Sequence, residues 1–389
     1  MNLKISTFFC IFCIPLAGAS LTQLGKTPDW NELERFQESI TKNEFSLALT
    51  DVYCPREEWW AHWIKVEEDH VRIRKEAGKD LWYTLRFAAP RDGNQTEEGT
   101  THSRPLAGLV IAVDPGHIGG AWSEMERRHF QIGEEKPVKE GDLALAVARA
   151  IIPELERLGS LPYLVRETLE PVTARRPSDF MDHSRKWVKQ IAGELPTAEE
   201  EKLIKERSEL LFYRVDEIHA RAQLINDLFR PDIVLCLHIN AAPWQDPDHP
   251  ELVDRNDFHI LVNGCYMGGE LAYDDQRFEM LVRLLNRWHI QERLLAESLS
   301  LAFAEVTGLP EFSYKGPNAL KVGDVPGVWA RNLLANRIYR SPVIFLEPYV
   351  ANSRSAHELI QKGEKGEFLV REYVDSVVLG LKKFYLKTE

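Results

Sequence analysis

The chain has 389 residues, of which 44% are hydrophobic and 28% charged, a composition typical of a folded globular protein rather than a disordered or fibrous one. Its formal net charge is −12, and the sequence contains no block of lysines or arginines. Nucleic acids and anionic membrane surfaces both require a basic footprint on the protein, so neither is expected as the main partner.

The first residues have the features of an export signal. Lys4 precedes a mostly apolar stretch at 5–19, which is too short for a comfortable membrane span. The stretch ends in Ala17-Gly18-Ala19, the small-x-small pattern that a signal peptidase accepts. We predict a signal peptide over 1–19 and an exported, cell-wall-associated protein, periplasmic or extracellular, with no stable membrane span after cleavage. The alternatives are a buried N-terminal strand and a retained anchor.

Three cysteines, Cys54, Cys236 and Cys265, lie outside this leader. Their odd number and the lack of a C-x-x-C spacing exclude a disulfide-rich scaffold and a cysteine-ligated zinc site of the usual spacing. Cys236 and Cys265 sit in apolar strand-like runs, which favours small buried hydrophobic residues. The sequence leaves open whether these two cysteines form a disulfide.

Residues 20–90 are predicted to form a small α+β module. Helical spacing of apolar residues and a capping box that begins at Thr41 indicate two helices. Period-two alternation then predicts strands at 63–67, 70–74 and 81–87. The module contains no catalytic constellation, and a binding role and a purely structural role are equally supported.

After a polar segment at 91–105 that is typical of a linker, strands alternate with helices from 106 to 389. The predicted strands span 109–113, 161–165, 232–238, 258–262 and 342–347. The predicted helices span 141–159, 213–229, about 286–306 and 364–385. This alternation predicts an α/β fold, a three-layer sheet with helices on both faces.

A charged segment at about 171–212 interrupts the alternation. Its run TAEEEKLIKERSELL predicts a helical insertion. We weigh two interpretations of this insertion, a solvated surface hairpin and a wall or lid over a cleft.

Polar residues that can carry chemistry follow several of the predicted strands. His117 comes after the strand 109–113, and His238 and Glu347 end the strands at 232–238 and 342–347. Glu140 begins a helix that follows a strand. Functional groups collect beyond the carboxyl ends of the strands in an open parallel sheet, so we expect these four side chains at one rim.

Two imidazoles and one carboxylate form a common catalytic zinc set in which a fourth position stays open for water. Zinc lowers the pKa of such a water to roughly 7, and a further carboxylate is then needed to carry the proton. We therefore predict His117, Glu140 and His238 as metal ligands and Glu347 as the catalytic acid–base group.

Four sequence blocks, in order, resemble the type-3 catalytic domain of the zinc-dependent N-acetylmuramoyl-L-alanine amidases. The resemblance covers about 106–385. The blocks are VDPGHIGG at 113–120, EGDLALAVA at 140–148, RAQLIND with DIVLCLHINAA at 221–242, and FLEPYVANS at 345–353.

The resemblance implies an exported peptidoglycan hydrolase that cuts the amide between the lactyl group of N-acetylmuramic acid and L-alanine of the stem peptide. It implies Zn²⁺ as cofactor, peptidoglycan as substrate and Glu347 as general base. Two departures stand out: Pro348-Tyr349 after the glutamate, and a long stretch before Glu140 that contains Glu135 as a rival ligand. We prefer Glu140 because Pro137 interrupts the chain directly after Glu135 and Lys136.

Two other functions stay open at this point. One is a zinc peptidase that acts within the stem peptide, and the other is a non-catalytic cell-wall-binding protein. The sequence identifies no protein activator, and it does not distinguish a role in cell separation from one in wall recycling or scavenging.

Overall fold

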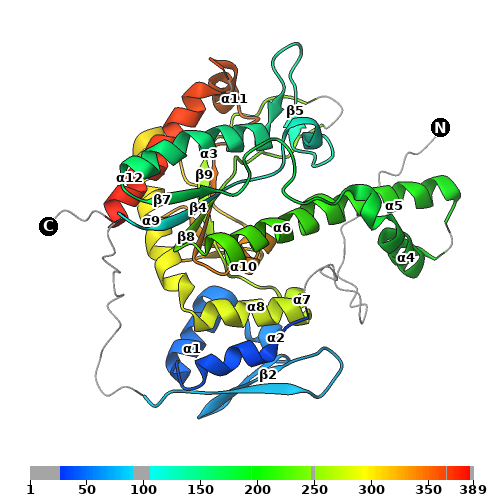
Figure 1. Ribbon diagram of the computed structural model, residues 1–389, viewed down its shortest axis with the longest axis vertical. Helices are drawn as coiled ribbons and strands as arrows, with labels where there is room; N and C mark the ends of the chain where they lie inside the picture. Colours follow the sequence, from blue (N-terminus) through cyan, green and yellow to red (C-terminus); the bar gives the residue numbers. More distant parts are fainter. Residues whose placement is uncertain (1–26, 91–105, 194, 247–249, 365, 386–389) are drawn as a thin grey trace.

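The computed structural model describes residues 27–90, 106–193, 195–246, 250–364 and 366–385 (Figure 1). The predicted signal peptide at 1–19 and the predicted linker at 91–105 lie outside these described residues, so both stay predictions. Within the described residues, no helix is both long enough and apolar enough to cross a membrane.

A seven-stranded mixed sheet in the order β10-β11-β9-β12-β8-β4-β7 forms the centre of the fold. The strands are β4 (Val110–Pro115), β7 (Leu161–Leu164), β8 (Ile233–Leu237), β9 (Phe258–Val262), β10 (Leu320–Lys321), β11 (Val328–Ala330) and β12 (Val343–Pro348). β4 runs parallel to β7 and β8, and β8 runs parallel to β12. The carboxyl ends of the parallel strands β4, β8 and β12 therefore lie at one edge of the sheet. The neighbouring strand β9 is antiparallel to β12.

Helices cover both faces of this sheet. One face carries Ile111, Leu235 and Leu346, which pack against α3 (Glu140–Arg157), α9 (Trp288–Thr307) and α12 (Glu367–Tyr385). The next residue along each strand points to the opposite face, where apolar side chains meet α6 (Glu217–Gln223), η6 (Leu224–Phe229) and α10 (Leu334–Ile338). The predicted three-layer α/β fold is confirmed.

The N-terminal residues form the small α+β module that the sequence predicts. Its antiparallel sheet has the order β1-β2-β3. The elements of the module are η1 (Trp30–Phe36), α1 (Lys42–Ala48), η2 (Leu49–Tyr53), α2 (Glu57–Trp60), β1 (Ile64–Val66), β2 (His70–Arg74) and β3 (Trp82–Arg86).

The module shares a hydrophobic core with the rest of the chain. Its buried side chains pack against α7 (Gly268–Leu271) and α8 (Asp274–Leu285), and the rings of Trp30 and Phe278 meet edge to face at 5.5 Å. Figure 1 shows α1 directly beside α8. The division of the chain at 91–105 is a prediction that the structure does not test.

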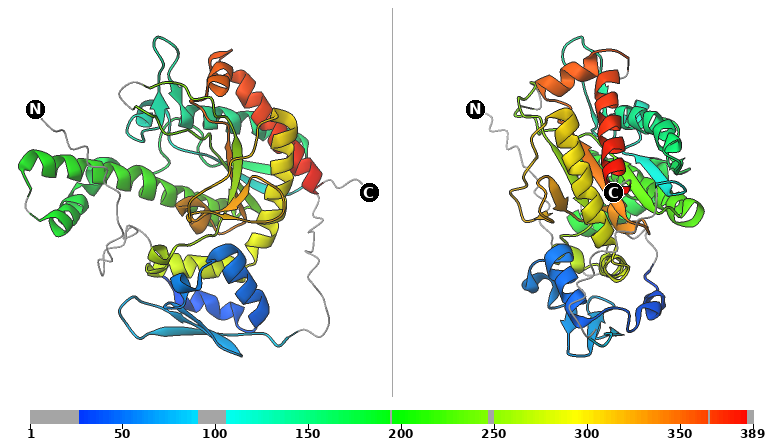
Figure 2. Two further views of the ribbon diagram at one scale, coloured as in Figure 1. Left: turned by 180° about the vertical axis from the view of Figure 1, so that it is seen from behind. Right: turned by 90° about the vertical axis from the view of Figure 1, so that its left-hand side faces the viewer.

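Helices occupy the charged segment between β7 and α6. They are η4 (Pro177–Phe180), α4 (Met181–Ala192), α5 (Thr197–Leu211) and η5 (Phe212–Asp216). α4 and the start of α5 project away from the body of the molecule (Figures 1 and 2). The other end of α5 returns to the body, where Phe180, Leu211 and Phe212 pack on Ile118, next to His117.

Short elements complete the rim of the sheet. They are η3 (Gly120–Ser123), the strand pair β5 (His129–Phe130) and β6 (Val138–Lys139), and α11 (Arg354–Gln361). Three of these elements lie between His117 and Glu140, so they fill the stretch that is long by comparison with the amidase motif.

Candidate metal centre

The turn after β4 places His117 at the edge of the sheet. His117 has a φ of 57°, in the left-handed region that residues with a side chain seldom adopt. Gly116 precedes it and lies against the ring of His238, where an added Cβ would come within 2.3 Å of Cε1. The glycine of the DPGH sequence is therefore required by the close approach of a second histidine.

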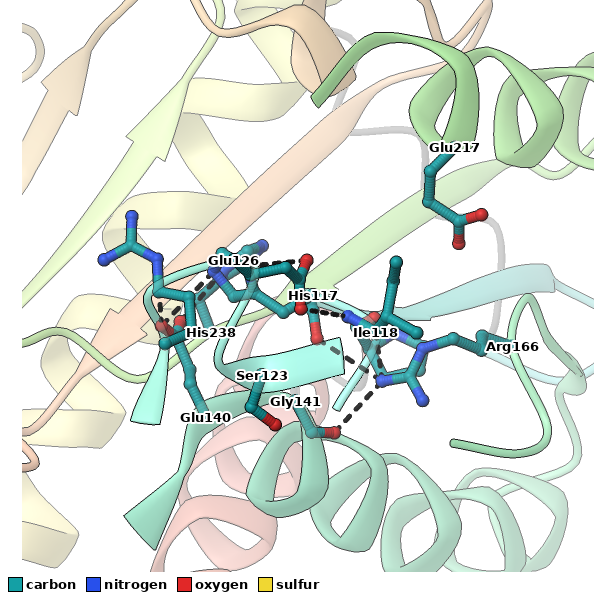
Figure 3. A network of polar contacts seen from close by, with 12 residues as sticks. His117, Ile118, Ser123, Glu126, Glu140, Gly141, Arg166, Glu217 and His238 are labelled. Carbon is teal, nitrogen blue, oxygen red and sulfur yellow. Dashed lines mark hydrogen bonds and ion pairs between the residues drawn. The ribbon is translucent and has the colours of Figure 1, made fainter. Parts of the chain in front are cut away.

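Two buried arginines fix this turn through its carbonyl groups. Arg221 of α6 donates hydrogen bonds to the carbonyl oxygens of Pro115 and His117 at 2.7 and 2.6 Å. Arg166 donates to the carbonyl oxygens of Gly116 and Gly141 at 3.3 and 3.0 Å (Figure 3). Because Gly141 follows Glu140, Arg166 links the turn that carries one candidate ligand to the helix that carries another.

Arg221 is balanced by acidic groups. It forms ion pairs with Asp114 at 2.9 Å and with Glu217 at 2.8 Å, and all three side chains are buried. Tyr339 donates its hydroxyl hydrogen to the other oxygen of Asp114 at 2.7 Å. The aspartate of the DPGH sequence, Asp114, therefore holds Arg221, which in turn binds the carbonyl groups of the turn.

Glu140 is the first residue of α3 and is buried. The backbone of Gly141 touches Gly119, and a Cβ on Gly141 would lie 2.5 Å from the Gly119 nitrogen. This contact brings the helix N-terminus against the His117 turn. Ile239 donates its backbone N–H to Oε1 of Glu140 at 3.3 Å, which ties the carboxylate to the chain after β8.

The carboxylate of Glu140 lies between the two histidines (Figure 3). Its Oε2 lies 3.2 Å from Nε2 of His117, and its Oε1 lies 3.2 Å from Nδ1 of His238. One ligand atom from each of the three residues lies within 4.8 Å of the other two. Two imidazoles and a carboxylate at this spacing fit a tetrahedral metal ion such as Zn²⁺.

The charged side chains of the cluster shift one another's pKa values. Burial lowers the pKa of His117, but the negative charges of Glu140 and Glu126 outweigh burial and raise that pKa to about 9. Burial raises the pKa of Glu140, yet the two histidines bring it well below its usual range. Burial lowers the pKa of His238, whose ring stacks on Phe345 with centroids 4.2 Å apart.

Glu347 lies near this cluster but is not one of its three members. The backbone N–H of His238 donates to the carbonyl oxygen of Leu346, so His238 and Glu347 stand at the same level of adjacent parallel strands. Burial, followed by the negative charge of Glu140, raises the pKa of Glu347 to about 8. A carboxyl group with such a pKa can both accept and return a proton near neutral pH.

Other residues singled out in the sequence have structural contacts. Glu135 is exposed and lies 3.5 Å from Nε2 of His357, outside the histidine–glutamate cluster. Asn226 accepts the backbone N–H of Arg340, and Asn352 accepts that of Ala242, both at 2.8 Å. Both asparagines therefore stabilise the loops at the ends of the strands.

Cys236 and Cys265 are both free and lie in different hydrophobic cores. Cys236 faces α6 and α10, whereas Cys265 belongs to the core on the opposite face of the sheet. The interpretation of both as small buried residues agrees with this placement, and the alternative of a disulfide between them does not.

Glu126 and Arg166 are neighbours of the centre that sequence reasoning missed. Glu126 is 5% exposed and contacts His117, and Arg166 is 1% exposed. The only sequence signal for Glu126 is its position in the long stretch between two candidate ligands. Arg166 carries no signal beyond following the strand at 161–165.

No protein-family model and no curated protein matches the chain. Among solved structures, it is similar to the CwlD amidase of Clostridioides difficile in complex with the GerS lipoprotein, at 12% identity and a TM-score of 0.40, over 72% of this chain and 100% of that one. The chain is also similar to the N-acetylmuramyl-L-alanine amidase of Mycobacterium smegmatis, at 16% identity and a TM-score of 0.40, over 73% of this chain and 100% of that one.

A third similar structure is the catalytic domain of the N-acetylmuramoyl-L-alanine amidase CwlV of Bacillus (Paenibacillus) polymyxa, at 13% identity and a TM-score of 0.36, over 72% of this chain and 99% of that one. Each of these three solved structures is described as an amidase.

Proposed function

We propose that the protein is an exported, zinc-dependent N-acetylmuramoyl-L-alanine amidase that acts on peptidoglycan. The observation that carries this proposal is the partly buried cluster of His117, Glu140 and His238, whose ligand atoms lie within 4.8 Å of one another. Glu347 adds a nearby carboxyl group that is not needed as a ligand. The four sequence blocks that resemble the amidase family supply the substrate class.

In this proposal His117, Glu140 and His238 hold Zn²⁺, which when bound supplies a Lewis acid that polarises a carbonyl group and lowers the pKa of water to roughly 7. Glu347 takes the proton from the attacking water and returns it to the nitrogen of L-alanine as the amide bond breaks. Its burial and its raised pKa suit both steps. Arg221 and Arg166 keep the ligand-bearing turn in place while the proton moves.

Product analysis distinguishes this function from its alternatives. Purified protein incubated with sacculi is expected to release stem peptides with a free N-terminal alanine and to leave muramic acid with a free lactyl carboxylate. A chelator should stop the release, and added Zn²⁺ should restore it. Peptides cut within the stem would indicate a zinc peptidase instead. Binding to sacculi without release or metal would indicate a non-catalytic wall protein.

The variant Glu347→Gln tests the proton-transfer role directly. Glutamine cannot accept the proton, so we expect a loss of turnover of about 10²- to 10⁴-fold, the usual contribution of a general base. Zinc content, measured by elemental analysis, should stay at the wild-type level because Glu347 is not a ligand.

The matched controls for this experiment are Glu135→Gln and Glu140→Gln. Glu135 is exposed, so its variant should keep both zinc and turnover. Glu140→Gln should lose zinc. Wild-type turnover in Glu347→Gln would overturn the proton-transfer assignment, and loss of zinc in Glu135→Gln would overturn the ligand assignment.

A further inference from the structure

A second buried carboxylate, that of Glu126, contacts His117 through the ring nitrogen that does not face Glu140. Oε1 of Glu126 lies 3.4 Å from Nδ1 of His117, and Oε2 accepts the backbone N–H of Ile118 at 2.9 Å. Figure 3 shows Glu126 and His117 side by side with this contact drawn. Glu126 therefore holds the ring of His117 and the backbone that follows it.

We propose that Glu126 is a positioning residue that sets the tautomer of His117 for metal binding. An ionised carboxylate has only acceptor sites, so the Nδ1 atom that it contacts must carry the hydrogen. The lone pair of His117 is then on Nε2, the atom that lies 3.2 Å from Oε2 of Glu140. This inference rests on the zinc site of the proposed function, and carboxylates that orient metal-binding histidines in this way are common.

Glu126 is 5% exposed, so its carboxylate is enclosed by protein. Its Oε2 accepts the backbone N–H of Ile118 at 2.9 Å, and its Oε1 faces Nδ1 of His117 at 3.4 Å. Both oxygens therefore face nitrogen atoms that can donate a hydrogen, which suits a carboxylate that acts only as an acceptor.

The helical insertion supports the loop that carries Glu126. Trp122 packs on Phe212 of η5 with ring centroids 5.2 Å apart, and the side chain of Met125 packs on the same apolar cluster. Glu126 donates its backbone N–H to the carbonyl oxygen of Trp122 at 3.1 Å. The position of Glu126 thus depends on contacts between the loop and the base of α5.

The test is the variant Glu126→Gln, which has nearly the same shape. If the glutamine oxygen accepts the N–H of Ile118, its NH₂ group faces Nδ1 of His117 and requires that nitrogen to be an acceptor. The hydrogen then moves to Nε2, the atom that should bind zinc. We expect zinc affinity, measured by competition with a chromophoric chelator, to fall about 10- to 100-fold. Nitrogen-15 NMR of the metal-free protein, recorded above the pKa of about 9 of His117 so that the ring is neutral, should show the ring hydrogen on Nδ1 in the wild type and on Nε2 in the variant.

Glu124→Gln is the matched control, because Glu124 is an exposed glutamate two residues away on the same loop. It should bind zinc as the wild type does. Glu126→Asp keeps an acceptor-only carboxylate and should keep the hydrogen of His117 on Nδ1. If Glu126→Gln lost zinc affinity only because it folds less well, Glu126→Asp would lose zinc affinity to a similar extent. The melting temperature of each metal-free variant reports folding independently.

Two outcomes separate this inference from the proposed function. If the wild type binds no zinc, the proposed zinc site fails. If the wild type binds zinc and Glu126→Gln binds it equally well with the hydrogen still on Nδ1, only the role of Glu126 is overturned.

Discussion

The ring of His117 is held by carboxylates on two of its sides and by its own strained backbone. Nε2 faces Glu140, Nδ1 faces Glu126, and the backbone has a φ of 57°. Such strain costs of the order of 1–3 kcal/mol and persists only where the surroundings fix it. Here Arg221 fixes it by binding the carbonyl oxygen of His117.

The four residues proposed from the sequence were chosen because each follows a strand or begins a helix. Three of them, His117, Glu140 and His238, meet in the structure, and Glu347 stands beside them. Glu126 could not be found in this way. Its contact with His117 depends on the path of the loop, which no apolar periodicity describes.

Gly116→Ala tests the packing of the two histidines. The added methyl group would overlap the ring of His238, which must then move away from Glu140. We expect zinc affinity to fall at least about tenfold, as when the support of a metal ligand is lost. Chelator competition measures this fall.

Gly133→Ala is the control for this variant, because Gly133 lies in the stretch before Glu140 and has no atom within 4 Å of its added Cβ. Its positive φ makes the alanine somewhat destabilising, but zinc affinity should not change. Equal zinc affinity in Gly116→Ala and Gly133→Ala would contradict the packing argument.

At the level of elements, a long helical segment from α5 to η6 links the insertion to the metal centre. Its middle part, α6, supplies Arg221, and its earlier part, η5, supports the loop that carries Glu126. Of the two interpretations of the insertion, a surface hairpin is consistent with α4 and the start of α5, which project away from the body (Figure 2). The base of the insertion packs beside Ile118.

The strands and helices with clear apolar patterns were predicted close to their observed bounds. α8 was not, because buried arginines interrupt its pattern: Arg277 and Arg283 are fully buried and bind backbone carbonyl groups. β10 and β11 have only two and three residues, which is too few for an alternation of apolar and polar residues to be recognised in the sequence. Tertiary contacts, rather than local periodicity, define these elements.

Arg221→Met tests whether α6 holds the ligand-bearing turn. Methionine removes the hydrogen bonds to the turn and leaves Asp114 and Glu217 buried without their partner. We expect the free energy of unfolding to fall by roughly 3–5 kcal/mol, as for other broken buried pairs, and zinc affinity to fall with it. Urea unfolding and chelator competition measure the two effects.

The matched control is Arg214→Met, an exposed arginine two helical turns earlier in the same segment. Its substitution should change the free energy of unfolding by less than about 0.5 kcal/mol. If Arg221→Met unfolds at the same urea concentration as this control, α6 does not support the turn in the way described.

At the scale of the whole molecule, the N-terminal module and the α/β sheet are joined through α8. One side of α8 packs on the module, and Arg283 of α8 forms an ion pair with Glu292 of α9, which accepts the backbone N–H of Val343 at the start of β12. Sequence reasoning predicted the small module but not its attachment, because the residues that join it are more than 200 positions apart.

Leu33→Ala tests this attachment. Leu33 is fully buried in the shared core, so its truncation should cost roughly 2–5 kcal/mol. Because the core is shared, calorimetry should show one unfolding transition that moves to a lower temperature as a whole.

Leu47→Ala is the control for the same substitution, since Leu47 lies on α1 of the module and is 51% exposed. It should leave the transition nearly unchanged. Two transitions, of which Leu33→Ala shifts only one, would show that the module unfolds independently of the sheet.

The shared core decides where this protein can be cut for expression. A fragment that starts at residue 106 would lack the module and present Phe278, Leu281 and Leu285 of α8 to water. Exposed apolar surface of this kind promotes aggregation. A shortened form intended for crystallisation should therefore begin before Trp30 and retain the module.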